Sequence, residues 1–243
     1  RPLSSWLSSN IQQFDVAHIH AVFNHSSIAA AHVCRKARVP YVVRPLGTLE
    51  PWSMTQKSLR KRVFWQVSGK GMLRRGAAVH YTSDAEKLST ERLLGLHHGR
   101  VIALGIEANS AISSAHVTLE QHFPELANGP YALVLSRLHP KKGLDVLIDV
   151  FLSLVQVQKF AHWGLVIAGD GPADYVLKLK ATARSSEQIL FTGWLDGEKK
   201  DAVLSGASLL VLPSHQENFG ISVAEALACG LPVVITRPVN SST

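Results

Sequence analysis

The stretch LLVLPSHQENFGISVAEALACGLPVVIT, residues 209 to 236, decides the fold class of this chain. An apolar run is followed by a polar loop, a segment of helical periodicity and a second apolar run. Short apolar runs without polar alternation are typical of strands buried on both faces, which occur in parallel sheets flanked by helices. The stretch therefore predicts a strand, a helix and a second strand of an α/β protein.

The same alternation continues along the whole chain. Apolar runs predict strands at 16–20, 41–44, 77–82, 101–104, 131–136, 164–169, 189–193, 209–213 and 232–236. Helical periodicity predicts helices at 26–37, 56–74, 84–94, 143–158, 173–185, 196–205 and 222–229. This order indicates two doubly wound, Rossmann-like units with parallel sheets.

The weakest periodicity lies at 107–130, which is rich in Asn, Ser, Gly and Pro and has no sustained strand or helix pattern. Such a segment is the natural boundary between the two units. We therefore predict a first unit at 1–108, a linker at 109–129 and a second unit at 130–243. Two such units side by side form a cleft, with ligands at the carboxyl ends of the strands.

Composition excludes several other classes of protein. The chain is 46% hydrophobic and 18% charged, which suits a globular protein, and no apolar run is long enough to cross a bilayer. We therefore expect a cytoplasmic protein. Cys34 and Cys229 lie far apart without metal-ligand neighbours, so we expect both to be buried and inert.

The excess positive charge is confined to the first half of the chain. The segment KSLRKRVFWQVSGKGMLRR, residues 57–75, has seven basic residues and no acidic one. One interpretation is contact with an anionic membrane surface. The other, slightly favoured by the pattern, is a solvated helix whose Leu59, Val63 and Val67 pack inward.

The loop and helix start at 214–229 carry a pattern suited to a nucleotide-sugar. Glu217 and Glu225 lie on either side of Gly220, and the N–H groups of Gly220, Ile221 and Ser222 are expected to have no partner in the first turn. A phosphate there would satisfy these donors and the helix dipole together. The two carboxylates would each face one sugar of the ligand.

The loop after the first strand of the second unit carries Arg137, Lys141 and Lys142. Cations in this position can neutralise a leaving diphosphate through charge-assisted hydrogen bonds. The turn AGDGP at 168–172 reads chiefly as turn chemistry, because Gly169 and Gly171 permit left-handed angles and Pro172 suits the first helical position.

Together the segments VLSRLHPKKGLDVLIDVF, LVIAGDGP, ILFTGWL and ASLLVLPSHQENFGISVAEALACGLPVV closely resemble the C-terminal half of the retaining GT-B glycosyltransferases of group 1, family 4. The segments FDVAHIHAVF, PYVVRPLGTLEPW and AAVHYTSDAE are similar to the later part of that family's N-terminal domain. The likeness implies a GT-B fold truncated at both ends, with an incomplete acceptor-side domain first and an incomplete donor-binding domain second.

The resemblance also implies residue roles. Arg137 and Lys142 would bind the donor diphosphate, Glu217 of the E-x7-E motif would contact the transferred sugar, and Glu225 would bind the nucleotide ribose. Backbone donors at Gly220 and Ile221 would meet phosphate. The implied reaction transfers a hexose from a UDP- or GDP-sugar, with retention and without metal or other cofactor, to a glycan or lipid-linked acceptor, in exopolysaccharide or other cell-surface polysaccharide synthesis.

One departure concerns Leu46, which stands where many relatives have a histidine that contacts the donor sugar. His20 and His25 are candidate substitutes. The departure leaves open an inactive or binding-only relative that still binds nucleotide-sugar. A GT-B epimerase or phosphorylase lacks a convincing residue set here, and a nucleic-acid-binding role lacks an aromatic stacking platform or recognition motif.

Overall fold

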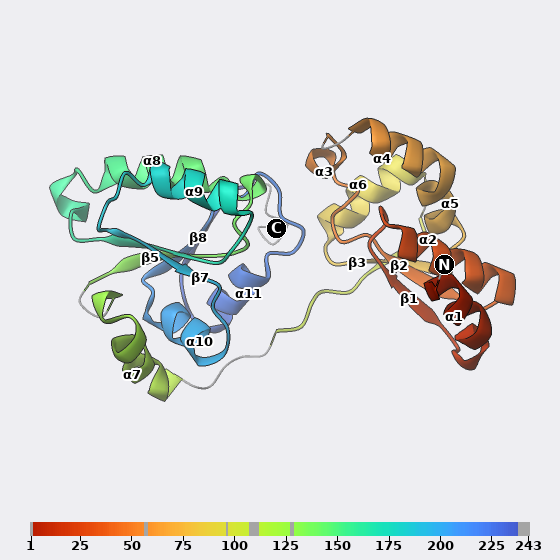
Figure 1. Cartoon of the computed structure of the whole chain (residues 1–243), viewed down its shortest axis with the longest axis horizontal. Helices are drawn as coiled ribbons and strands as arrows, with labels where there is room; N and C mark the ends of the chain where they lie inside the picture. The colour runs from red at the N-terminus through yellow and green to blue at the C-terminus, as the bar shows by residue number, and fades with distance from the viewer. Residues whose placement is uncertain (1, 56–57, 96, 107–111, 127–128, 238–243) are drawn as a thin grey trace. The chain divides into compact units, whose positions relative to one another are not determined.

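The computed structural model describes residues 2–55, 58–95, 97–106, 112–126 and 129–237. The chain divides into two compact units, Arg1–Leu104 and Gly105–Thr243 (Figure 1). The first contains a sheet of order β1-β2-β3-β4 and the second a sheet of order β7-β6-β5-β8-β9, with every strand pair parallel. The predicted α/β class is confirmed.

The first unit begins with a helix that the sequence analysis did not predict. Its elements are α1 (Pro2–Asn10), η1 (Ile11–Gln13), β1 (Ala17–His20), α2 (His25–Ala37), β2 (Tyr41–Arg44), α3 (Pro51–Thr55), α4 (Ser58–Phe64), η2 (Trp65–Gly69), α5 (Lys70–Arg74), β3 (Ala78–Tyr81), α6 (Asp84–Leu94) and β4 (Gly99–Val101). The element η2 is a π-helix that joins α4 to α5. Asn24 and Ser83 cap α2 and α6, each accepting a backbone N–H in the first turn.

The core of the first unit lies on one face of its sheet. Ile19, Val43 and Val79 are buried there against the helices. On the opposite face, His18 and His20 of β1 are exposed. The expectation that strands of this sheet are buried on both faces is therefore wrong among the described residues.

The helical segment of α4 and η2 turns its aliphatic side chains outward. Leu59, Val63 and Val67 are 76%, 58% and 78% exposed, respectively. The interpretation that packs these three side chains inward is wrong, because Trp65, Met72 and Leu73 supply the buried contacts instead. Among the described residues, no helix is both long and apolar enough to cross a bilayer.

The second unit is covered on both faces of its sheet. Its elements are α7 (Ile112–His122), η3 (Pro124–Leu126), β5 (Tyr131–Leu135), η4 (Pro140–Lys142), α8 (Leu144–Leu154), η5 (Gln158–Phe160), β6 (Gly164–Ala168), α9 (Ala173–Thr182), β7 (Ile189–Gly193), α10 (Gly197–Gly206), β8 (Leu209–Leu212), α11 (Ile221–Ala228) and β9 (Val233–Ile235). Figure 1 shows α8 and α9 on one side and α7, α10 and α11 on the other. Leu133 and Val134, adjacent on β5, point into the two different cores.

Helix α7 is a second element that the sequence analysis did not predict. It occupies part of the segment 107–130, for which no sustained helix was expected. Leu119 of α7 and Leu126 of η3 are buried in the same core as Ala202 and Val203 of α10. This packing against α10 stabilises a helix whose polar sequence gives little periodicity of its own.

A buried carboxylate fixes the loop that follows β2. Glu86 of α6 is fully buried and accepts hydrogen bonds from the backbone N–H of Gly47 at 2.6 Å and of Thr82 at 2.9 Å. The loop contains Leu46 at φ 59° and Gly47 at φ 65°, both in the left-handed region. Because left-handed backbone at a leucine is costly, the loop needs such a fixed partner.

Replacing this carboxylate should destabilise the first unit. In Glu86→Ala the two buried N–H groups lose their acceptor, so we expect a loss of on the order of 3 kcal/mol. Urea unfolding and amide hydrogen exchange at Gly47 measure the loss. Asp84→Ala, an exposed change in the same helical turn, should cost less than about 1 kcal/mol. Equal effects of the two substitutions would contradict this role of Glu86.

Candidate functional site

The candidate site lies where the order of the strands in the second sheet reverses. β5 pairs with β6 on one side and with β8 on the other, so the order of the strands along the chain reverses next to β5. Crevices at such points, outside the carboxyl ends of parallel strands, are the usual ligand sites of open α/β sheets. The predicted residues Arg137 and Lys142 lie in the loop after β5, and Glu217 lies in the loop after β8.

The two loops are packed against each other by backbone contacts. The N–H of His215 donates to the carbonyl of Lys141 at 2.9 Å. Gly143, at φ 63°, lies so close to Pro213 that a side chain would overlap the Pro213 carbonyl oxygen. The positions of the loops are thus fixed relative to each other before any ligand binds.

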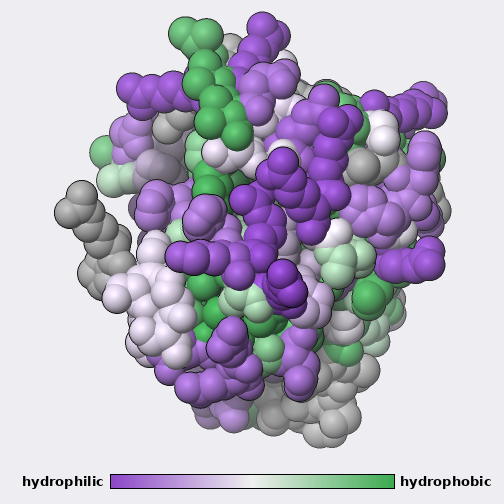
Figure 2. Space-filling model, turned by 90° about the vertical axis from the view of Figure 1, so that its right-hand side faces the viewer, coloured by the Kyte–Doolittle hydropathy of each residue, from purple (hydrophilic) through white to green (hydrophobic). Residues whose placement is uncertain are grey.

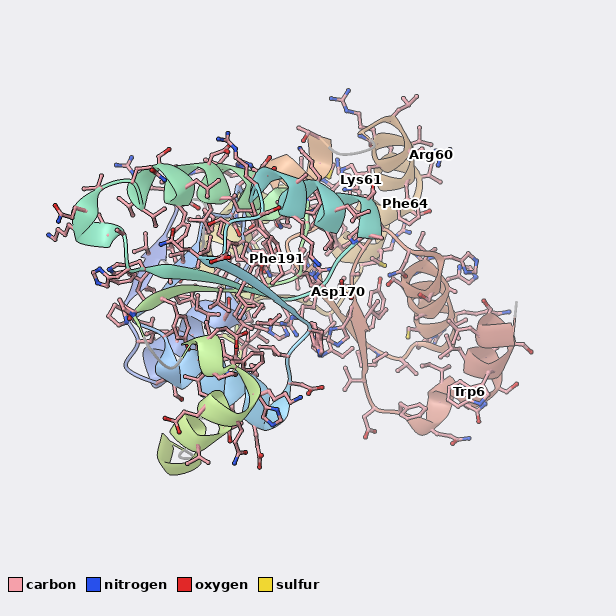
Figure 3. The ribbon with its side chains drawn as sticks, turned by 60° about the vertical axis from the view of Figure 1, so that its left-hand side comes forward. Trp6, Arg60, Lys61, Phe64, Asp170 and Phe191 are labelled. Carbon is pink, nitrogen blue, oxygen red and sulfur yellow. The ribbon has the colours of Figure 1, made fainter. Side chains whose placement is uncertain are left out.

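The turn after β6 supports the loop that carries Arg137. The N–H of Leu138 donates to the carbonyl of Asp170 at 2.8 Å, and Figure 3 shows Asp170 in this turn. Gly169 has φ 147°, in the region predicted for it. Gly171 does not have a positive φ. A glycine is required there because a Cβ atom would overlap the carbonyl oxygen of Leu138. Pro172 is the N-cap of α9 rather than its first residue.

Lys142 and Glu217 form an ion pair between the two loops. The ammonium group of Lys142 donates directly to Oε2 of Glu217, and both side chains are mostly buried, with exposures of 14% and 18%. The second carboxylate oxygen of Glu217 accepts from the N–H of Asn218 at 3.3 Å. Two residues that the sequence analysis singled out separately are therefore in direct contact, whereas Arg137 is exposed in the same loop.

The start of α11 has the predicted form. Gly220 adopts φ 72° and precedes the first helical residue, Ile221, without a side-chain cap. Among the described residues, no group accepts a hydrogen bond from the N–H of Gly220, Ile221 or Ser222. Helix α11 packs through Val223 and Ala226, which are buried, whereas Leu227 and Ala228 are exposed.

Glu225 has a partner that the sequence analysis missed. Nζ of Lys200, on α10, lies 2.9 Å from Oε1 of Glu225, and the two side chains are 27% and 24% exposed. No sequence pattern links the two residues, because they belong to different helices whose contact depends on the order of the strands. Cys229, one turn beyond Glu225, is free and partly buried, whereas the other cysteine, Cys34, is fully buried.

The candidate residues of the first unit, Leu46, His20 and His25, are exposed to solvent. Leu46 is 40% exposed in the loop held by Glu86. His20 is exposed at the end of β1, with its ring centroid 4.5 Å from that of His18, and His25 is exposed at the start of α2. Throughout the described ranges, no group of three or more His, Cys, Asp or Glu residues is arranged to hold a metal ion.

The loop after β5 is electrostatically positive. Nδ1 of His139 accepts from the N–H of Lys141 at 3.1 Å and so caps η4. Burial lowers the pKa of His139, and the charges of Arg137, Lys141 and Lys142 lower it further. The neutral ring is therefore the form that the folded loop favours.

Comparison with known proteins identifies the family of this chain. Residues 118–242 match the family model for glycosyl transferases group 1, and residues 1–105 match the model for a glycosyl transferase 4-like domain. Alpha-D-kanosaminyltransferase of Streptomyces kanamyceticus is 27% identical over 90% of this chain and 58% of its own length. A GDP-mannose-dependent alpha-(1-6)-phosphatidylinositol dimannoside mannosyltransferase of Mycobacterium tuberculosis is 36% identical over 42% of this chain and 26% of its own.

The solved structure of Anabaena HepE with UDP-glucose aligns with a TM-score of 0.80 and 23% identity, over 99% of this chain and 64% of that one. The fold is therefore that of the GT-B glycosyltransferases, as predicted. The chain spans between about a quarter and two thirds of the length of these three proteins.

The titration of His139 should report the charge of this loop. The folded pKa lies below 6.5, so the stability contributed by the neutral ring is fully present above pH 6.5 and is lost as the pH falls through the folded value. In Arg137→Gln we expect the pKa to rise but to stay below 6.5, because burial is the larger cause. An NMR titration measures both values; an unchanged pKa in the variant would refute the influence of Arg137.

Proposed function

The chain belongs to the group 1 glycosyl transferases, and from this premise we propose that the protein moves a hexose from a nucleotide-diphospho-sugar to a glycan or lipid-linked acceptor. The observation that carries the proposal is the contact of Lys142 with Glu217 between the loops that follow β5 and β8. A cation beside a carboxylate supports the binding of a ligand that carries both phosphate and sugar hydroxyls.

We assign one role to each group at the site. Arg137 and Lys142 bind the donor diphosphate, aided by the N–H groups of Gly220, Ile221 and Ser222 at the start of α11. Glu217 accepts hydrogen bonds from the transferred sugar, and Glu225 accepts them from the ribose. Lys142 has three N–H donors and can bind a phosphate oxygen while it stays paired with Glu217.

The proposed reaction proceeds with retention at the anomeric carbon. The bond between this carbon and the diphosphate oxygen breaks first, and the acceptor oxygen attacks from the same face. The departing diphosphate oxygen takes the acceptor's proton, so no protein base is required. Arg137 and Lys142 stabilise the charge that develops on the diphosphate, which makes the site independent of a metal ion.

UDP and GDP are the candidate nucleotides of the donor. HepE is solved with UDP-glucose, and the mycobacterial mannosyltransferase is named for GDP-mannose. The same mannosyltransferase is named for a phosphatidylinositol-linked acceptor, which motivates a lipid-linked acceptor and a role in cell-surface polysaccharide synthesis here. The alternative is a relative that binds the nucleotide-sugar without transferring it, for which Leu46 is the motivating residue.

We further propose that residues 57–75 contact the inner, anionic surface of a membrane. Leu59, Val63 and Val67 recur every four residues and are all exposed. Arg60 and Arg62 are exposed beside them, and Figure 3 marks Arg60 on α4. Figure 2 shows the side of the molecule that lies at the right of Figure 1, where hydrophobic side chains (green) are scattered among predominantly hydrophilic ones (purple). Exposed aliphatic and basic side chains on one helix are typical of interfacial membrane binding.

Nucleotide titration tests the donor site. Calorimetry with UDP, GDP and ADP should find one that binds, and Arg137→Ala and Glu225→Ala should each weaken it by about 10- to 100-fold, the effect of losing a hydrogen bond to a charged group. Lys159→Ala, at the amino-terminal edge of the same sheet, is the matched control and should leave binding unchanged. If none of the three nucleotides binds, the proposal is rejected.

Transfer and binding-only functions differ in turnover. The protein is incubated with the nucleotide-sugar that contains the nucleotide found to bind, and slow hydrolysis should release the nucleoside diphosphate. The release should be slower in Arg137→Ala, because this variant stabilises the leaving diphosphate less well. Tight binding without any release, in the presence or absence of a glycan acceptor, would favour the binding-only alternative.

Vesicle sedimentation tests the membrane contact. Vesicles containing anionic phosphatidylglycerol should bind the protein, and Arg60→Gln/Arg62→Gln should weaken binding by roughly tenfold or more. The control Arg92→Gln/Arg100→Gln removes the same charge from exposed positions elsewhere in the first unit. Equal losses in the two variants would show a response to net charge alone and would exclude a specific surface.

A further inference from the structure

The position of Lys200 on α10 is electrostatically unfavourable for a cation, and its contact with Glu225 on α11 offsets this. Lys200 lies in the first turn of α10, where its N–H donates to the carbonyl of Asp196 at 3.3 Å. The positive end of a helix dipole disfavours a cation in the first turn. The carboxylate of Glu225, 2.9 Å away on α11, is the group that compensates this cost.

The charges of this pair also act on Cys229, one turn beyond Glu225. The pKa of this thiol is raised by burial first, then by the charges of Asp201 and Glu225, and is lowered by Lys200. All three charges therefore lie within electrostatic reach of one side chain at the end of α11. Lys200 thus lies beside the helix that carries the proposed ribose ligand.

The second unit therefore contains two similar pairs, Lys142 with Glu217 and Lys200 with Glu225. Each proposed sugar-binding carboxylate has its own lysine. A diphosphate entering between two unpaired carboxylates would be repelled, and the lysines remove that repulsion. In the second pair the lysine donates to Oε1 of Glu225, and no group among the described residues donates a hydrogen bond to Oε2.

We propose that Lys200 is a positioning residue for the ribose of the donor nucleotide. Its ammonium group holds Oε1 of Glu225 and orients Oε2 to accept a hydrogen bond from the 2′-hydroxyl of the ribose. This inference rests on the proposed donor site and adds to it the residue that determines preference for a ribonucleotide. A site built to hydrogen-bond a hydroxyl discriminates strongly against the analogue that lacks it.

A purely structural role has a different signature. If the pair only fastened α10 to α11, its removal would weaken binding of every nucleotide by the same factor. If Lys200 positions Glu225 for the ribose, its removal weakens the ribonucleotide and leaves the deoxyribonucleotide almost unchanged. The ratio of the two affinities therefore separates the roles.

The experiment compares UDP with 2′-deoxy-UDP, or GDP with 2′-deoxy-GDP, by calorimetry. We expect the unsubstituted chain to prefer the ribonucleotide by about tenfold or more, as for one hydrogen bond to a charged group. Lys200→Met should remove most of this preference, and Lys200→Arg should retain it. Lys199→Met is the matched control: it removes the same charge from the neighbouring, exposed residue and should retain the preference.

Glu225→Gln provides a second test that keeps Lys200 in place. It should also lose the ribose preference, and the double variant Lys200→Met/Glu225→Gln should lose no more than either single one. Thermal unfolding of each variant verifies that it is folded. Additive losses in the double variant would overturn the proposal.

The outcomes separate this inference from the donor site itself. Equal weakening of both nucleotides in Lys200→Met, or an unchanged preference, would overturn the role of Lys200 while the donor site stands. No nucleotide binding by the unsubstituted chain would reject both proposals.

Discussion

The second unit depends on the double pairing of β5. This strand is hydrogen-bonded to β6 on one side and β8 on the other, and its side chains enter two separate cores. Because the strand is fixed on both sides, the loop that leaves it has a defined position and packs against the loop after β8. Lys142 meets Glu217 where these two loops are in contact. Gly143 and Gly171 let the supporting backbones approach closely enough to hold that contact.

Charge compensation is the second feature of the site. Glu217 and Glu225 are both largely withdrawn from water, where a carboxylate without a partner is costly. Each is paired with a lysine from another element, so neither carboxylate is left without an opposite charge. Arg137 stays exposed in the loop after β5, where its charge is available to an entering anion. This arrangement supports the proposed donor, in which a diphosphate joins two sugars.

The first unit is built asymmetrically. One face of its sheet carries the core, while the other carries His18 and His20, and α4 exposes aliphatic and basic side chains together. The buried carboxylate of Glu86 fixes the left-handed backbone at Leu46 and Gly47 in the loop after β2. The loop at the carboxyl end of β2 is therefore rigid, with a leucine side chain presented to solvent.

Sequence alone predicted most of the strands and helices, and it located Arg137, Lys142 and Glu217 in segments that follow strands and Glu225 in a helix, because apolar periodicity and turn residues are local properties. It did not determine α7, whose stability comes from packing on α10, nor the outward direction of Leu59, Val63 and Val67. An apolar side chain packs inward only where a neighbouring element offers a surface. Likewise, the pairs Lys142–Glu217 and Lys200–Glu225 join residues far apart in the chain. Only the order of strands in the sheet brings them together, and that order is a property of the tertiary structure.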